Sequence, residues 1–190
     1  MKTPHLAANG RKRPIKTGTL LAFAISFAVA SLALTIGKAE AETGKTGLPL
    51  PRFASLKSSR VNMRVGPGSE YQVLWLYVKR GLPVEIIQEF DNWRKVRDPQ
   101  GNEGWMLHSL LSGRRTAIVT PWNRGVDDQM ISMLDAPDGD AHLMAKVEPG
   151  VVAKVSYCEN QWCKLSAEDA HGFVKQDLLW GVYPDETIND

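Results

Sequence analysis

Two cysteines and two of the four histidines are the residues of this chain best suited to catalysis or metal binding. Cys158 and Cys163 are separated by four residues, and His142 and His171 lie on either side of them. A cysteine beside a histidine base can act as a nucleophile, and two cysteines with two histidines can bind zinc. A catalytic thiol, however, needs a lowered pKa and access to substrate, and this spacing matches no common zinc motif. The remaining use of the two cysteines is a disulfide.

Aromatic residues near the segment GPGSEYQVLWLY form a second group of candidates. Trp75 and Tyr77 are two residues apart, so they share one face of an extended strand. An aromatic groove can hold a peptide or a glycan strand, and an arginine can pair with a carboxylate. The predicted ligand-binding residues are Arg64, Tyr71, Trp75, Tyr77 and Trp93. Packing into a small core is the competing interpretation for the aromatic residues, and a solvated strand face is the one for Arg64.

The elements that must position these residues have the two-residue period of β-strands. Val61, Met63 and Val65 alternate with polar residues, and Gly66-Pro67-Gly68 ends that segment in a turn. No stretch after the N-terminal segment shows a long apolar period of 3.6 residues. The strands are predicted at residues 61–65, 72–78, 82–90, 93–97 and 103–107, followed by one helical turn at 108–113. A five-strand unit of this size is all-β and closes best as a small barrel.

The same unit occurs twice in the chain. Sliding the sequence by about 70 residues aligns RVNMRVGPGSEYQ with MISMLDAPDGDAH. Nearly the same register pairs Trp93 with Trp162 and Gly104 with Gly172. We therefore predict two tandem barrels. Trp93 and Trp162 follow hairpin turns and are expected to line a surface groove, whereas Trp105 and Trp180 are expected to pack in the cores.

The repeat register places the two cysteines on a hairpin. Asn160-Gln161 falls at the turn, so Cys158 lies opposite Cys163 in a non-hydrogen-bonded pair with α-carbons about 4.5 Å apart. That separation allows a disulfide, which is worth about 2 kcal/mol for so short a loop. The equivalent pair in the first repeat is Glu89 and Arg94, whose opposite charges stabilise the strand pair more weakly.

The motifs of the first repeat resemble those of a known family. RVNMRVGPGSEYQV, a D-N-W hairpin, an N-E-G-W strand and a short L-L turn are similar to a bacterial SH3-like (SH3b) domain. The second repeat is degenerate, because Leu134 replaces the arginine and Ala136-Pro137-Asp138 replaces Gly-Pro-Gly. The resemblance implies binding modules linked to the cell envelope, with no chemistry of their own.

The N-terminal segment has the pattern of a secretory signal peptide. Its first residues carry several lysines and arginines, an apolar run extends from Leu20 to Ile36, and Ala39-Glu40-Ala41 follows. The alternative is an uncleaved membrane anchor, for which the apolar run is slightly short. We predict residues 1–41 to be removed and the protein to be exported, to the periplasm or another extracytoplasmic compartment. Such a compartment is oxidising and permits the disulfide.

The remainder of the chain divides by composition and charge. We predict a flexible tether at residues 42–53, a first barrel at 54–119, a linker at 120–127 and a second barrel at 128–190. Residues 52–120 carry 11 basic and 6 acidic side chains, a net charge of +5, whereas residues 121–190 carry 5 basic and 13 acidic ones, a net charge of −8. The two barrels can attract each other, or the basic one can meet an anionic envelope polymer. Export and a net charge of −3 over residues 42–190 argue against nucleic acid as a partner.

Together these patterns predict an exported binding module that is not an enzyme and has no cofactor or metal. Its expected partner is peptidoglycan or an envelope protein, and it touches the membrane only if the signal segment is not cleaved. The alternatives are a structural or scaffolding subunit of an envelope complex and an accessory factor of a cell-wall hydrolase.

Overall fold

The structure is a computed structural model that describes residues 42–123, 125 and 129–189. The predicted signal segment, residues 1–41, lies outside the described residues. Apart from three short 3-10 turns, the described secondary structure is β-strand, which confirms the all-β prediction. No helix in this part of the chain is long and apolar enough to cross a membrane.

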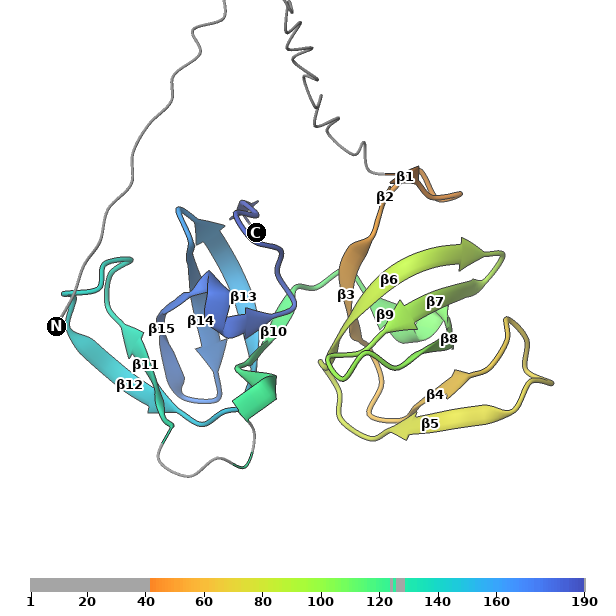
Figure 1. Cartoon of the computed structure of the whole chain (residues 1–190), viewed down its shortest axis with the longest axis horizontal. Coiled ribbons are helices and arrows are strands. Elements are labelled where there is room, and N and C mark those ends of the chain that lie inside the picture. The colour runs from red at the N-terminus through yellow and green to blue at the C-terminus, as the bar shows by residue number, and fades with distance from the viewer. Residues whose placement is uncertain (1–41, 124, 126–128, 190) are drawn as a thin grey trace, which may run out of the picture. The chain divides into compact units, whose positions relative to one another are not determined.

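The first barrel is one antiparallel sheet of seven strands in the spatial order β5-β4-β8-β7-β6-β3-β9 (Figure 1). In chain order the strands are β3 (Arg52–Leu56), β4 (Val61–Arg64), β5 (Val73–Tyr77), β6 (Pro83–Phe90), β7 (Trp93–Arg97), β8 (Glu103–Leu107) and β9 (Leu111–Ser112). A 3-10 turn, η1 (His108–Leu110), precedes β9. The strand predictions agree with these bounds to within a residue at each end.

The second barrel repeats this arrangement in the order β12-β11-β15-β14-β13-β10-β16 (Figure 1). Its strands are β10 (Thr116–Val119), β11 (Ile131–Leu134), β12 (Leu143–Val147), β13 (Val152–Glu159), β14 (Trp162–Ala167), β15 (Ala170–Lys175), β16 (Leu179–Trp180) and β17 (Ile188–Asn189), which pairs with β13. Two 3-10 turns, η2 (Pro121–Asn123) and η3 (Gln176–Leu178), complete it.

Each barrel closes over its own apolar core. Met63 and Met106 are fully buried in the first core, and Met133 and Leu165 are buried in the second. The equivalent glycines Gly104 and Gly172 let two strands come close. A methyl group on Gly104 would lie 2.8 Å from the Arg64 carbonyl oxygen, and one on Gly172 would lie 2.8 Å from that of Leu134. The two repeats are therefore two copies of one fold.

The N-terminal part of the described chain differs from the flexible tether that its proline and glycine content predicts. Residues 42–50 form a small hairpin of β1 (Glu42–Thr43) and β2 (Pro49–Leu50), and β3 already begins at Arg52. Thr46 in the hairpin donates hydrogen bonds to the buried Glu89 carboxylate from its backbone N–H at 2.9 Å and its hydroxyl at 2.7 Å. This long-range contact fixes the segment, and composition alone does not reveal it.

The strand pairing also shifts the division between the repeats. Residues 116–119, predicted to end the first barrel, form β10 and pair with β13 and β16 of the second sheet. β10 thus occupies the place in the second sheet that β3 occupies in the first. The predicted linker begins with Thr120, which is buried, and continues into the 3-10 turn η2.

Candidate functional site

Two of the five residues predicted to bind a ligand, Arg64 and Tyr71, hold a loop together. A guanidinium nitrogen of Arg64 donates to the Tyr71 carbonyl oxygen at 2.6 Å. The Tyr71 ring lies over Gly66, where an added methyl group would come within 2.5 Å of it. The arginine and the tyrosine therefore fix the loop between β4 and β5, and Tyr71 remains 43% exposed.

Trp75 and Tyr77 lie on the same face of β5, as the two-residue period predicts. The register pairs Trp75 with Met63 and Tyr77 with Val61, and directly opposed residues of a sheet share a face. The Tyr77 hydroxyl donates to Asp98 at 2.8 Å, and burial together with this bond raises the pKa of the tyrosine. Tyr77 thus completes the barrel, whereas Trp75 is 53% exposed at the edge of the sheet.

Trp93 lies on the opposite, outer face of the sheet. It is paired with Phe90 on β6 and Leu107 on β8. Trp105, expected in the core, is half-buried on this outer face, and its ring meets Phe90 edge-on with centroids 6.4 Å apart. The five predicted residues therefore do not converge on one groove.

The second barrel contains a hollow of the size of a small-ligand site. It has a volume of about 770 Å³ and lies between the turn before β14, the end of β15, η3 and the C-terminal segment. Its walls include Gln161, Trp162, Lys175, Gln176, Asp177 and Asp185. The expectation that Trp162 lines a groove agrees with this position.

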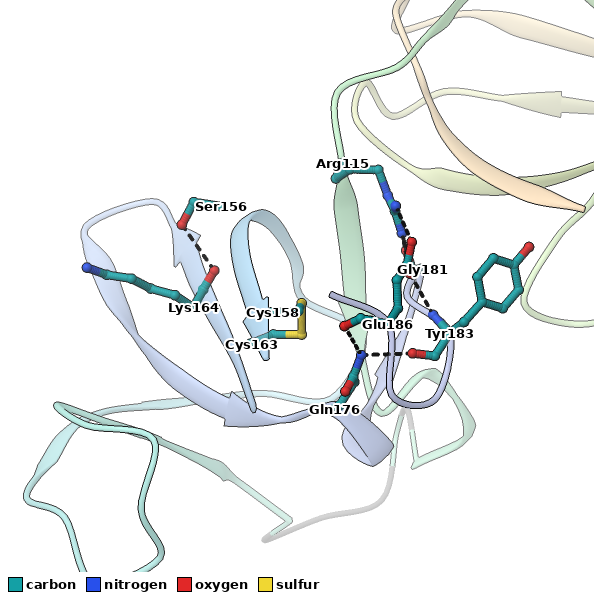
Figure 2. Close-up of a disulfide and its surroundings, with 9 residues drawn as sticks. All are labelled: Arg115, Ser156, Cys158, Cys163, Lys164, Gln176, Gly181, Tyr183 and Glu186. Carbon is teal, nitrogen blue, oxygen red and sulfur yellow. Dashed lines mark hydrogen bonds and ion pairs between the residues drawn. A yellow bond between two sulfur atoms is a disulfide. The ribbon is translucent and has the colours of Figure 1, made fainter. Parts of the chain in front are cut away.

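A disulfide joins the two strands of the hairpin that carries Trp162. Cys158 and Cys163 are bonded, with α-carbons 4.1 Å apart, and they face each other in the register of β13 and β14 (Figure 2). Asn160 and Gln161 form the turn, both with positive φ, at 50° and 66°. The predicted disulfide and hairpin register are confirmed. The disulfide links the cross-strand pair next to the pair of Glu159 and Trp162, so it restricts the motion of the hairpin end that carries Trp162.

The opposite wall is a C-terminal segment that Gln176 fastens to the barrel. The side-chain Nε2 of Gln176 donates to the carbonyl oxygens of Tyr183 at 2.8 Å and Glu186 at 3.0 Å (Figure 2). Arg115 pairs with the Glu186 carboxylate at 2.7 Å, and the Tyr183 backbone N–H donates to it at 2.9 Å. Burial alone would raise the pKa of Glu186, but these donors outweigh it and lower the pKa below its usual value.

Gln176, which lines the hollow, also has a buried side-chain atom without a hydrogen-bond partner. The residue is 5% exposed, and among the described residues its Oε1 accepts no hydrogen bond. A buried amide oxygen without a donor is costly, so an N–H or O–H group that reached it, from a water molecule or a ligand, would be favoured.

The charges around the hollow have both signs. The ammonium nitrogen of Lys175 lies 5.9 Å from the centroid of the Trp162 ring, and Asp177 and Asp185 contribute carboxylates. The arrangement can stack a ring or an apolar group on the tryptophan while it pairs a carboxylate and an amine of the same ligand. Within the described part of the chain, no three His, Cys, Asp or Glu side chains are placed to hold a metal ion.

Sequence reasoning found Trp162 but missed the other residues of this hollow. Trp162 faces Lys175 as Trp93 faces Leu107, so Lys175, Gln176 and Asp177 take the places of Leu107, His108 and Ser109. The available signal was that Lys175 and Asp177 introduce two charged side chains where the first repeat has Leu107 and Ser109. It becomes visible only after the two repeats are aligned strand by strand.

The sequence of this chain is similar to that of a longer bacterial protein. The chain is 25% identical over 132 residues to the Bacillus subtilis (strain 168) protein named "Putative N-acetylmuramoyl-L-alanine amidase YrvJ". That segment covers 66% of this chain and 25% of the relative, so the chain spans about a quarter of that protein's length.

Solved structures with a detectable likeness include NlpC2 from Trichomonas vaginalis, at 10% identity and a TM-score of 0.30, covering 68% of this chain and 48% of that one. An NlpC/P60 family protein from Bacillus cereus ATCC 10987 matches at 11% identity and a TM-score of 0.29, covering 67% of this chain and 55% of that one.

The sequence model described as the bacterial SH3 domain matches this chain twice, at residues 57–113 and 127–181. The two matches fall on the two barrels and together cover more than half of the chain. The predicted resemblance is confirmed, and the chain belongs to the bacterial SH3 domain family as a tandem of two such domains.

Proposed function

We propose that this protein is a non-catalytic binding protein of the cell envelope that holds a segment of peptidoglycan in the hollow of its second barrel. The observation that carries the proposal is a hollow lined by Trp162, by charged side chains of both signs and by Gln176, whose buried Oε1 has no hydrogen-bond partner among the described residues. Such a site offers a stacking surface, an acceptor and two kinds of charged partner within one volume.

Peptidoglycan combines the groups that this site would recognise. Its glycan carries sugar rings that can stack on a tryptophan, and its stem peptides carry amide N–H groups, carboxylates and amines. The relative named as an N-acetylmuramoyl-L-alanine amidase supports the choice, because that name refers to a unit of peptidoglycan. The amidase activity itself is not part of the proposal, since the similarity covers 25% of that protein.

The proposal gives the two cysteines a structural role. A thiol tied in a disulfide cannot act as a nucleophile, and Cys158 and Cys163 are both fully buried and bonded to each other. Disulfides persist outside the reducing cytoplasm, which supports export by the predicted signal segment. Contact with the membrane then depends on whether that segment is retained.

A second candidate is an accessory factor that brings a cell-wall hydrolase to its substrate, which the amidase relative favours. The binding site is the same in both cases, and the two functions differ in whether a hydrolase accompanies the protein. Addition of the purified protein to a muralytic assay separates them, because an accessory factor raises the rate of a hydrolase and a simple binding protein does not.

Co-sedimentation with purified sacculi tests the proposal. We expect the protein to pellet with sacculi and the variant Lys175→Ala to pellet less, because Lys175 is an exposed residue of the hollow whose loss leaves the core intact. The matched control is Lys154→Ala, an exposed lysine of β13 that does not line the hollow. Equal retention of all three proteins, or no retention of any, would contradict binding through this site.

A further inference from the structure

Strand β5 of the first barrel is an unprotected apolar edge. It is the terminal strand of its sheet and pairs only with β4 among the described strands. Val73, Leu74, Trp75 and Leu76 are 39% to 53% exposed, and Val78 beyond the strand is 66% exposed. Both faces of the strand therefore present apolar side chains to solvent next to unpaired backbone groups. Proteins normally block such an edge, because it pairs readily with another strand.

The second barrel shows how this chain blocks the same edge. β12 is also the terminal strand of its sheet, and the registers make Lys146 the counterpart of Leu76 and Ala145 the counterpart of Trp75. A lysine within an edge strand opposes pairing with a further strand. The pairing of β4 with β5 and the pairing of β11 with β12 contain the same register shift, after Met63 and after Met133. The difference between the two edge strands therefore lies in their side chains.

We propose that β5 is a self-association edge, where a second copy of this chain adds its own β5 antiparallel about a two-fold axis through Trp75. The two seven-stranded sheets then continue into one another. This inference does not depend on the proposed function, because it rests on the first barrel and the hollow lies in the second.

Charge complementarity selects a second copy as the occupant. A two-fold axis through Trp75 places Glu70 of one copy near Arg80 of the other, since each lies five residues from the axis. Both side chains are exposed, and neither takes part in an ion pair within the described part of the chain. Residues 72–78 between them carry no charge. The edge is therefore self-complementary, apolar in its centre and oppositely charged at its ends, as a two-fold interface requires.

Sedimentation velocity of the purified protein tests the association. We expect a dimer whose dissociation constant rises at least tenfold in Leu76→Lys, which gives β5 the lysine that β12 already has. The matched control, Met144→Lys on the exposed edge of β12, should leave the dimer unchanged. Far-ultraviolet circular dichroism checks that each variant folds.

Cysteine cross-linking tests the register independently. The chain's own two cysteines are bonded to each other, so a new thiol is the sole reactive one. Trp75→Cys should form a dimer under mild oxidation, because its two copies meet at the axis. Val78→Cys should not, because its copies lie six residues apart, about 20 Å along the strands. A protein that stays monomeric at its highest soluble concentration, a dimer unaffected by Leu76→Lys, or cross-linking at 78 but not at 75 would overturn the proposal.

Discussion

Glu89 is a buried charged side chain of the first barrel with several polar partners. Its side chain is 2% exposed and pairs with Arg52 at 2.6 Å and Arg94 at 3.3 Å, in addition to the two hydrogen bonds from Thr46. Burial would raise its pKa, but the donors from Thr46 and Arg52 outweigh burial and lower the pKa to about 2. The sequence predicted only the cross-strand pair with Arg94, because Thr46 and Arg52 are 43 and 37 residues away along the chain.

This pKa predicts an acid-dependent stability. A carboxylate whose pKa is lower in the folded protein than in the unfolded chain stabilises the fold above the unfolded value of 4.5, and that contribution is lost as the pH falls toward about 2. The lowering corresponds to about 3 kcal/mol. Urea denaturation between pH 7 and pH 2.5 should show the free energy of unfolding falling over this range.

Substitution of the same residue checks the assignment. Glu89→Gln should destabilise the protein at pH 7 by about 3 kcal/mol, because it leaves the partly buried guanidinium of Arg52 and the buried one of Arg94 without their carboxylate. The variant should also lose most of the decline in stability between pH 5 and pH 2.5. Glu148→Gln, at an exposed site, serves as the control. An unchanged acid decline in Glu89→Gln would show that other carboxylates cause it.

Removal of the disulfide should weaken the second barrel alone. The double variant Cys158→Ser, Cys163→Ser frees a short hairpin loop in the unfolded chain, and the chain-entropy model gives a loss of about 2 kcal/mol. Chemical denaturation measures it. Titration of the denatured wild-type protein should detect no free thiol, and two free thiols would contradict the bond.

At the scale of elements, the sequence predicted what local patterns encode and missed what distant contacts encode. The alternation of Val61 and Met63 and the D-N-W turn located β4, β6 and β7 to within a residue. The hairpin at residues 42–50 escaped, because Glu89 on β6 stabilises it and its own composition is that of a loop. The hollow escaped for a similar reason, since its walls come from segments that only the closed barrel brings together.

The close approach of Gly44 to Glu89 makes docking of this hairpin testable. A methyl group on Gly44 would lie 2.6 Å from Oε2 of Glu89, and that carboxylate cannot move without breaking its bonds to Thr46 and Arg52. Gly44→Val should therefore release residues 42–50, and limited proteolysis should cut them faster. Gly113→Ala is the control, because no atom lies within 4 Å of its added methyl group. Equal cleavage of the two variants would contradict docking through Glu89.

At the scale of the whole molecule, the two barrels share a fold but present different surfaces. The hollow with Lys175, Gln176 and Asp177 belongs to the second barrel, and the open edge strand belongs to the first. A dimer through β5 would carry two hollows, and two linked sites hold a polymeric ligand more tightly than one. Leu76→Lys should therefore lower retention on sacculi while it leaves the affinity for a soluble muropeptide unchanged, as measured by co-sedimentation and by calorimetry.

Ligand binding in the hollow of the second barrel can be measured by titrating the purified protein with a soluble disaccharide-peptide fragment of peptidoglycan. Calorimetry of Trp162→Ala should give a dissociation constant at least tenfold higher than wild type, a loss of about 1.4 kcal/mol. Its counterpart in the first barrel, Trp93→Ala, should bind as wild type does. Equal binding by Trp162→Ala and wild type, or a loss confined to Trp93→Ala, would contradict binding of peptidoglycan in this hollow.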